Sequence, residues 1–184
     1  LFENLDAVTN IHITTGKTKE EITGFLKKME LDDIAGKPVS EYSGGMKRRV
    51  AIAGVMAMRP EVLILDEPTA GLDPRGREEI LEEIKAYRRQ TGATILLVSH
   101  SMEDVARHAQ QILVMNAGKV FCYGTVENVF RRSQELQAIG LAVPQITRVC
   151  NALRAKGIPL TEDIFTVEQA KEQLIAWYRK KGEQ

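Results

Sequence analysis

The feature that most limits how this 184-residue chain can fold is an apolar run, Val62–Leu65, that leads directly into Asp66 and Glu67. A run of this length is typical of a strand buried in a parallel sheet. Ligands of such sheets bind in the crevice outside the carboxyl ends of the strands. The two carboxylates would therefore lie beside a bound ligand. A strand that ends in an ordinary polar turn has the same pattern, so the run alone does not decide.

Strands and helices alternate after this run. The predicted elements are a helix from Pro74 to Gly92, a strand over 94–99, a helix over 102–109, and two strands over 112–115 and 120–123. The stripe of that first helix is Ile80, Leu81, Ile84 and Tyr87. The alternation predicts the α/β class, in which parallel strands are buried between helices.

Residues 1–42 are polar and interrupted by glycine and proline. Their one amphipathic stretch, Glu20–Met29, has apolar residues at i, i+3, i+4 and i+7, which predicts a helix. Gly16–Thr18 has the sequence that ends a phosphate-binding loop, G-x-x-x-x-G-K-[ST], but Ile11 stands where the first glycine should be. We interpret Gly16–Thr18 as a turn.

Composition excludes several classes of protein. The 25 basic residues balance the 25 acidic residues and 43% of the chain is hydrophobic, which is typical of a globular domain that does not coat nucleic acid. Cys122 and Cys150 are far apart and fit a reducing compartment. No uncharged apolar stretch approaches the roughly 18 residues of a membrane-spanning helix.

A second candidate site begins at Ser43, Gly44 and Gly45, which precede a helix whose apolar run continues to Met58. Free N–H groups and the positive end of the helix dipole form an anion site there, and glycines allow a phosphate to approach closely. A glycine-rich turn with a capping serine is the alternative. The basic cluster Lys47–Arg49 is spread around this helix, so we interpret it as a solvated face.

Taken together, four motifs in this order resemble the nucleotide-binding subunit of an ATP-binding-cassette (ABC) transporter. They are the signature segment Ser43–Gly45, the Walker B strand Leu63–Glu67, the D-loop Ala70–Asp73 and the switch histidine His100. The resemblance covers Tyr42 to about Val129. It implies an α/β fold that is part of the P-loop NTPase (ABC ATPase) fold, with a helical subdomain and a small C-terminal helical appendage.

The resemblance implies ATP and Mg²⁺ as cofactors and gives three side chains a role in hydrolysis. Asp66 would act on Mg²⁺, directly or through water, and Glu67 would be the general base or would orient the attacking water. His100 would hydrogen-bond an oxygen of the γ-phosphate. A histidine after a strand is otherwise most often structural.

The same resemblance assigns the remaining site residues to an interface between two ATPase subunits. Ser43, Gly44 and Gly45 would contact the γ-phosphate of ATP bound to the partner, so that two subunits enclose two nucleotides. Asp73 would link the two sites. Because Asp73 precedes Pro74, it is also well suited to cap the next helix, and both roles can hold together.

Three further segments resemble the energy-coupling-factor (ECF) subgroup of these ATPases: Arg48–Gly54, Ala138–Ile146 and Gly157–Leu160. This implies an ATPase that powers the import of vitamins or transition-metal ions. Its partners would be a second ATPase subunit, identical or different, a transmembrane scaffold subunit and a substrate-binding membrane subunit, without nucleic acid. Its location would be peripheral, at the cytoplasmic face of the membrane.

We expect three parts: a helical subdomain over 1–58, an α/β part over 59–132 and a helical dimerisation tail over 133–184. The opening Leu1-Phe2-Glu3 resembles the segment that follows the coupling glutamine loop. We therefore expect the phosphate loop and that glutamine to lie upstream of Leu1, and the isolated chain to be inactive.

Two other functions share part of this pattern. A chromosome-maintenance or DNA-repair ATPase has the same signature and Walker B motifs, but would need a long coiled-coil insertion and a basic face, and this balanced chain shows neither. The other is a truncated, non-catalytic interaction module.

Overall fold

The computed structural model describes residues 1–182. They form two compact units, Leu1–Val98 and the residues from Ser99 onward. Within residues 1–182, no helix combines the length and the apolar character that crossing a membrane requires.

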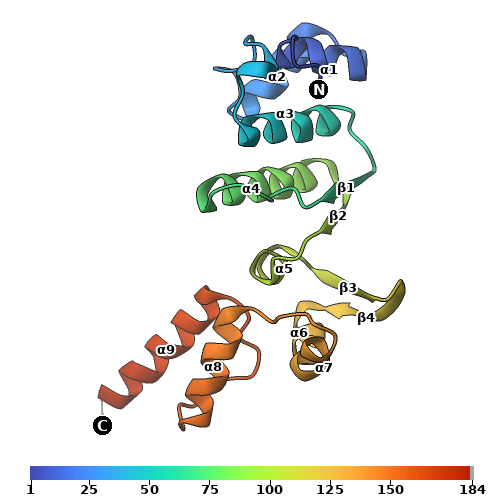
Figure 1. Ribbon diagram of the computed structural model, residues 1–184. Coiled ribbons are helices and arrows are strands. Elements are labelled where there is room, and N and C mark those ends of the chain that lie inside the picture. The colour runs from blue at the N-terminus through green and yellow to red at the C-terminus, as the bar shows by residue number, and fades with distance from the viewer. Residues whose placement is uncertain (183–184) are drawn as a thin grey trace. The chain divides into compact units, whose positions relative to one another are not determined.

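The first unit is mainly helical (Figure 1). Its elements are α1 (Ala7–Thr15), α2 (Lys19–Lys28), the 3-10 helix η1 (Val39–Glu41), α3 (Gly44–Ala57), β1 (Val62–Asp66), α4 (Pro74–Thr91) and β2 (Thr94–Val98). Helix α3 lies between the pair α1 and α2 and the helix α4 (Figure 1). The helices predicted over 20–29, from Ser43 and from Pro74 are confirmed.

Helix α1 was not predicted. It begins after Asp6, whose carboxylate accepts a hydrogen bond from the Thr9 N–H at 2.7 Å, and ends at Gly16 in the left-handed conformation, φ 68°. Thr18 then begins α2 in a reciprocal capping box with Glu21. The interpretation of Gly16–Thr18 as a turn is therefore confirmed.

One core holds the first unit together, and all four residues of the predicted α4 stripe are buried in it. Other members come from α2 and α3, namely Ile22, Leu26, Val50, Ala53 and Met56. Helices in proteins are stabilised mainly by burial of their apolar face. This shared core therefore fixes α3 and α4 against each other.

Strands β1 and β2 pair in parallel, with Val62 opposite Thr94 and Asp66 opposite Val98. Leu63 on the inner face is 1% exposed, whereas Ile64 on the outer face is 67% exposed. The expectation of a strand buried on both faces is therefore wrong for the described residues. The reason is that helices cover one face of this two-stranded sheet, while Val62, Ile64, Leu96 and Val98 remain exposed.

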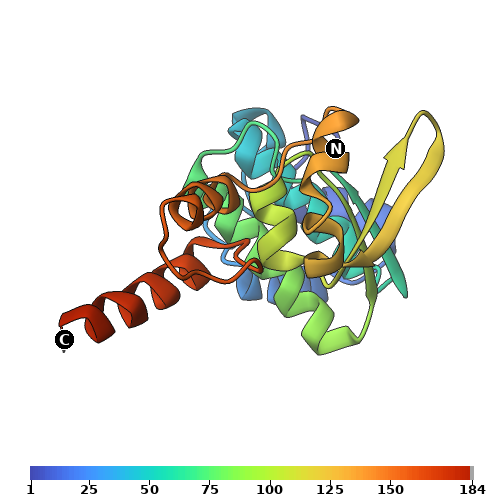
Figure 2. The same ribbon diagram turned by 90° about the horizontal axis from the view of Figure 1, so that it is seen from below.

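The second unit contains a hairpin and five helices among its described residues (Figure 2). They are α5 (Met102–His108), β3 (Gln111–Asn116), β4 (Lys119–Thr125), α6 (Val126–Phe130), α7 (Ser133–Ala138), α8 (Gln145–Ala155) and α9 (Val167–Gly182). Strands β3 and β4 are antiparallel and form their own sheet. Only β1 and β2 of the described strands therefore fit the expectation of parallel pairing.

Helices α8 and α9 share a small core with the segment between them. Cys150, Ile164 and Ala170 are each at most 2% exposed within it. Thr166 and Gln169 form a capping box at the start of α9: the Gln169 N–H donates to Thr166 Oγ1 at 3.3 Å, and the Thr166 N–H donates to Gln169 Oε1 at 3.0 Å. Both cysteines are free thiols, and burial raises the pKa of the Cys150 thiol.

Candidate functional site

The acidic pair lies where β1 ends. Asp66 is the last residue of the strand and is exposed, and Glu67 follows it with φ 45°, in the left-handed region that residues other than glycine rarely adopt. The Glu67 N–H donates to the Val98 carbonyl at 2.9 Å, so the end of β2 holds the first residue of the loop.

The loop from Glu67 to Asp73 is built of consecutive turns. The Ala70 N–H donates to the Glu67 carbonyl at 3.1 Å, and the Leu72 N–H donates to the carbonyl of buried Thr69 at 3.3 Å. Asp73 ends the loop, and its Oδ1 accepts from the Gly76 N–H at 2.7 Å. The capping role of Asp73 is confirmed, while its role in linking two subunits stays a prediction.

The signature segment opens α3. Ser43 has extended backbone dihedrals, and its Oγ accepts from the Met46 N–H at 3.2 Å, which makes it the helix cap. Ser43 and Gly44 are exposed, so the first N–H groups of α3 are accessible. Gly45 faces the other way, because a Cβ placed on it would lie 3.0 Å from Leu72 Cδ2. The structure thus brings the start of α3 against the loop after β1.

The basic cluster on α3 corrects one interpretation. Lys47 forms an ion pair with Glu3 at 2.8 Å, Arg48 donates to the carbonyls of Glu67 and Ala70, and Arg49 donates to the Met29 carbonyl. The solvated-face interpretation is therefore wrong: the three cations are half-buried and each has its own partners. The side chains of successive helical residues point in directions about 100° apart. This geometry could have indicated that the three cations contact three different parts of the chain.

Arg49 also connects α3 to α4 through charge. Its Nη2 lies 2.5 Å from Glu83 Oε1, and its Nη1 lies 3.7 Å from Glu79 Oε2. The Glu83 side chain is 17% exposed. Burial raises the pKa of the Glu83 carboxyl, and the hydrogen bond from Arg49 opposes that effect.

His100 belongs to the second unit. It is exposed and follows the last residue of β2 by two positions. The first unit unites the other six site residues, Ser43, Gly44, Gly45, Asp66, Glu67 and Asp73, on the start of α3 and the loop after β1. The role of His100 stays a prediction from its sequence position.

A metal ion at this site would depend on few protein ligands. The described residues contain no group of three or more histidine, cysteine, aspartate or glutamate side chains arranged to hold a metal. Mg²⁺ does not require one, because it is commonly held by one or two carboxylates together with substrate phosphates and water. The exposed carboxylate of Asp66 at the end of β1 fits that kind of site.

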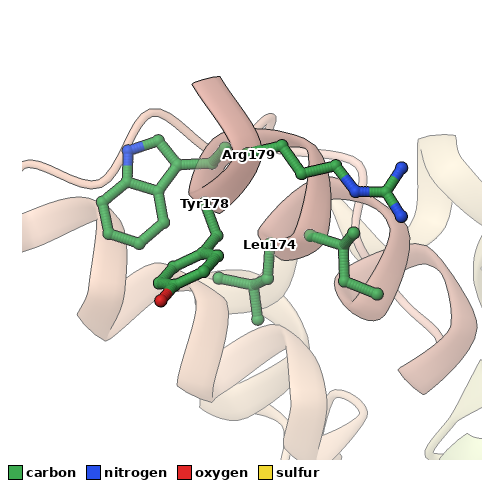
Figure 3. Close-up of a pocket in the computed structure, with 5 residues that line it drawn as sticks. Leu174, Tyr178 and Arg179 are labelled. Atoms are coloured by element: carbon green, nitrogen blue, oxygen red, sulfur yellow. The ribbon is translucent and has the colours of Figure 1, made fainter. Parts of the chain in front are cut away.

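A hollow of about 490 Å³ lies on α9, lined by Leu174, Ile175, Trp177, Tyr178 and Arg179. Figure 3 shows the side chains of Leu174 and Tyr178 next to each other, with Arg179 on another side of the helix. Tyr178 is 74% exposed. The lining carries no carboxylate or imidazole for acid–base chemistry, so it suits contact with an apolar surface.

Comparison with known proteins agrees with this geometry. The family model described as "ABC transporter" matches residues 1–70. The energy-coupling factor transporter ATP-binding protein EcfA2 of Caldanaerobacter subterraneus subsp. tengcongensis is 46% identical over 172 residues, 93% of this chain and 60% of that protein. EcfA2 of Clostridium perfringens is 50% identical over 166 residues, 87% of this chain and 58% of that protein. The chain thus spans about three fifths of these relatives.

Solved structures support the same assignment. The structure of cbiO1 from Clostridium perfringens, described as part of the ABC transporter complex cbiONQ, has a TM-score of 0.65 and 29% identity, covering 82% of this chain and 62% of that one. A putative metal-chelate type ABC transporter in an inward-facing conformation has a TM-score of 0.66 at 20% identity, over 74% of this chain and 58% of that one, and shows the fold alone.

The α/β, ABC ATPase fold that the sequence predicts is therefore confirmed. Over most of its length the chain is similar to ATP-binding proteins of ABC transporters. The relatives that share 46–50% identity with it are energy-coupling factor transporter ATP-binding proteins.

Proposed function

We propose that this chain supplies the signature segment, the Walker B strand, the D-loop and the switch histidine of an ATP-hydrolysing subunit. That subunit powers an ABC importer of the energy-coupling-factor type. The observation that carries the proposal is the packing of Gly45 at the start of α3 against Leu72, in the loop that begins with Glu67. It joins an accessible helix N-terminus, which suits a phosphate, to an acidic pair, which suits metal and water.

Each site residue then has a defined task. Asp66 holds Mg²⁺, and Glu67 accepts a proton from the attacking water or orients that water. The metal, when bound, neutralises charge on the phosphates. His100 donates a hydrogen bond to the γ-phosphate, and Asp73 links the two sites while it caps α4.

Ser43, Gly44 and Gly45 act on the nucleotide of a second ATPase subunit, which is identical or different. Backbone N–H groups at the start of α3 bind its γ-phosphate, and the positive end of the helix dipole adds to the attraction. Two subunits therefore enclose two ATP molecules, each contacted from both sides.

The second unit contributes to the pairing of the two ATPases. Its α9 presents exposed apolar side chains, with Val167 59%, Ile175 41% and Tyr178 74% exposed, next to the hollow described above. An exposed apolar surface of this kind is typical of an interaction site. The division into parts over 1–58, 59–132 and 133–184 belongs to this proposal.

The remaining partners are a transmembrane scaffold subunit and a substrate-binding membrane subunit. The assembly works at the cytoplasmic face of the membrane, where this subunit is peripheral, and imports a vitamin or a transition-metal ion. The likeness to cbiO1, described as part of the cbiONQ transporter complex, supports this choice.

The test is ATP hydrolysis by the full-length gene product, assembled with its membrane subunits, in the wild type and in Glu67→Gln. The variant is expected to bind ATP with wild-type affinity, to lose turnover and to accumulate as an ATP-bound dimer on size-exclusion chromatography. Unchanged turnover in Glu67→Gln would remove Glu67 from the mechanism. Absence of turnover in the wild-type assembly would remove the function.

A further inference from the structure

Among Lys47, Arg48 and Arg49, Arg48 is the residue that donates hydrogen bonds to the loop after β1. Its Nη1 donates to the Glu67 carbonyl at 2.8 Å and to the Ala70 carbonyl at 2.7 Å. Lys47 and Arg49, its neighbours, contact Glu3 and Met29 instead. One guanidinium nitrogen therefore joins the second turn of α3 to both ends of the turn that starts at Glu67.

That turn needs support, because Glu67 has φ 45°. A residue with a Cβ persists in the left-handed region where its surroundings hold it there. The Val98 carbonyl holds the Glu67 N–H, and the Glu67 carbonyl accepts from both Ala70 N–H and Arg48. Arg48 supplies the only charged donor among these contacts, and hydrogen bonds from ionised donors are about twice as strong as neutral ones.

We propose that Arg48 is a positioning residue for Glu67. Resting on the function proposed above, the inference is that Arg48 fixes the peptide after Glu67 and so sets the direction in which the carboxylate leaves the backbone. Because Arg48 lies on the helix that begins with Ser43, it also makes the position of Glu67 depend on the position of that helix. Phosphate bound at the start of α3 would thereby restrict the carboxylate of the same chain.

The test uses the full-length assembly and compares Arg48→Met with Lys47→Met. Methionine keeps an unbranched apolar stem and removes every donor. Arg48→Met is expected to lower kcat by about 10- to 100-fold, the size of effect that a small misplacement of a catalytic group produces, with KM for ATP within about twofold. Arg48→Lys, which can still donate to the two carbonyls, should recover part of kcat. Lys47→Met should keep the wild-type kcat.

A double-mutant cycle separates positioning from general destabilisation. If Arg48 acts through Glu67, Arg48→Met has no further effect on the residual turnover of Glu67→Gln, because both variants remove the same contribution. Additive losses, or a wild-type kcat in Arg48→Met, would overturn the inference. These outcomes differ from failure of the proposed function, in which the wild-type assembly itself does not hydrolyse ATP.

Discussion

Gly45 on α3 and Leu72 in the loop after β1 pack so closely that a Cβ on the glycine would lie 3.0 Å from Leu72 Cδ2. The neighbouring Gly44 has no atom within 4 Å of the corresponding position. The two glycines of the signature segment are therefore constrained differently: Gly45 by contact within the chain and Gly44 by nothing in its own unit.

This difference predicts unequal effects of alanine on folding. Gly44→Ala should be neutral or stabilise by up to about 1 kcal/mol, because alanine has the higher helix propensity. Gly45→Ala should be about 1 kcal/mol less stable than Gly44→Ala, since Leu72 must move. Urea unfolding of the chain measures both. Adding Leu72→Ala should remove the penalty of Gly45→Ala specifically, and equal stability of the two single variants would contradict the packing.

Ser43 permits a test that separates its two roles. Ser43→Ala removes the cap of α3 and should lower stability by about 1 kcal/mol. Ser43→Asp should restore that stability, because aspartate is an equally good cap and its charge suits a helix N-terminus.

The negative charge of Ser43→Asp would, however, repel a phosphate. In the full-length assembly this variant should therefore fold normally and hydrolyse ATP poorly, as measured by urea unfolding and phosphate release. Wild-type turnover in Ser43→Asp would show that Ser43 is a helix cap without a role at the nucleotide.

Local signals in the sequence were sufficient to predict much of the secondary structure of the first unit. Asp73, Pro74 and Gly92 are a cap, a first-turn proline and a left-handed terminator, and α4 begins and ends at them. Helix α1 has a cap in Asp6 and a left-handed terminator in Gly16, but the residues between them are largely β-branched or polar and show no clear helical pattern. It is held by burial of Ala7 and Ile11 and by the Ala7 N–H, which donates to the Ala35 carbonyl at 3.1 Å.

The acidic pair and the signature glycines could be found from motif order, whereas the contacts between α3 and the loop after β1 could not. Arg48 reaches carbonyls 19 and 22 positions away, and no periodic pattern contains that information. The same limit applies to Ile64: an apolar run predicts burial on both faces, but exposure depends on which layers pack against the strand.

The two cysteines should differ in reactivity. Cys150 is 1% exposed, and burial raises the pKa of its thiol, while Cys122 is half-buried. The thiolate is the reactive form. Cys150 should therefore react with iodoacetamide at pH 8 more slowly than Cys122, by about tenfold or more. Mass spectrometry of peptides after a short pulse measures the two rates. In urea the rates should converge, and faster labelling of Cys150 in the folded chain would contradict its burial.

Burial of the Glu83 carboxyl should make the stability of the first unit depend on pH. Burial raises the pKa of Glu83 above its ordinary value of 4.5, so the folded state holds this proton more tightly than the unfolded state does. The contribution of Glu83 to stability is then complete below pH 4.5 and is lost as the pH rises through the raised pKa.

Two variants test the direction of this pH dependence of stability. Glu83→Gln keeps an acceptor for Arg49 and cannot titrate, so the urea midpoint should lose the part of its pH dependence that lies just above pH 4.5. Arg49→Met removes the partner that lowers the pKa of Glu83, so the pH-dependent region should extend to higher pH, with a strong loss of stability above it from an unpaired buried charge. If the urea midpoint of the wild type and of Glu83→Gln followed the same pH curve, burial of Glu83 would not affect its ionisation.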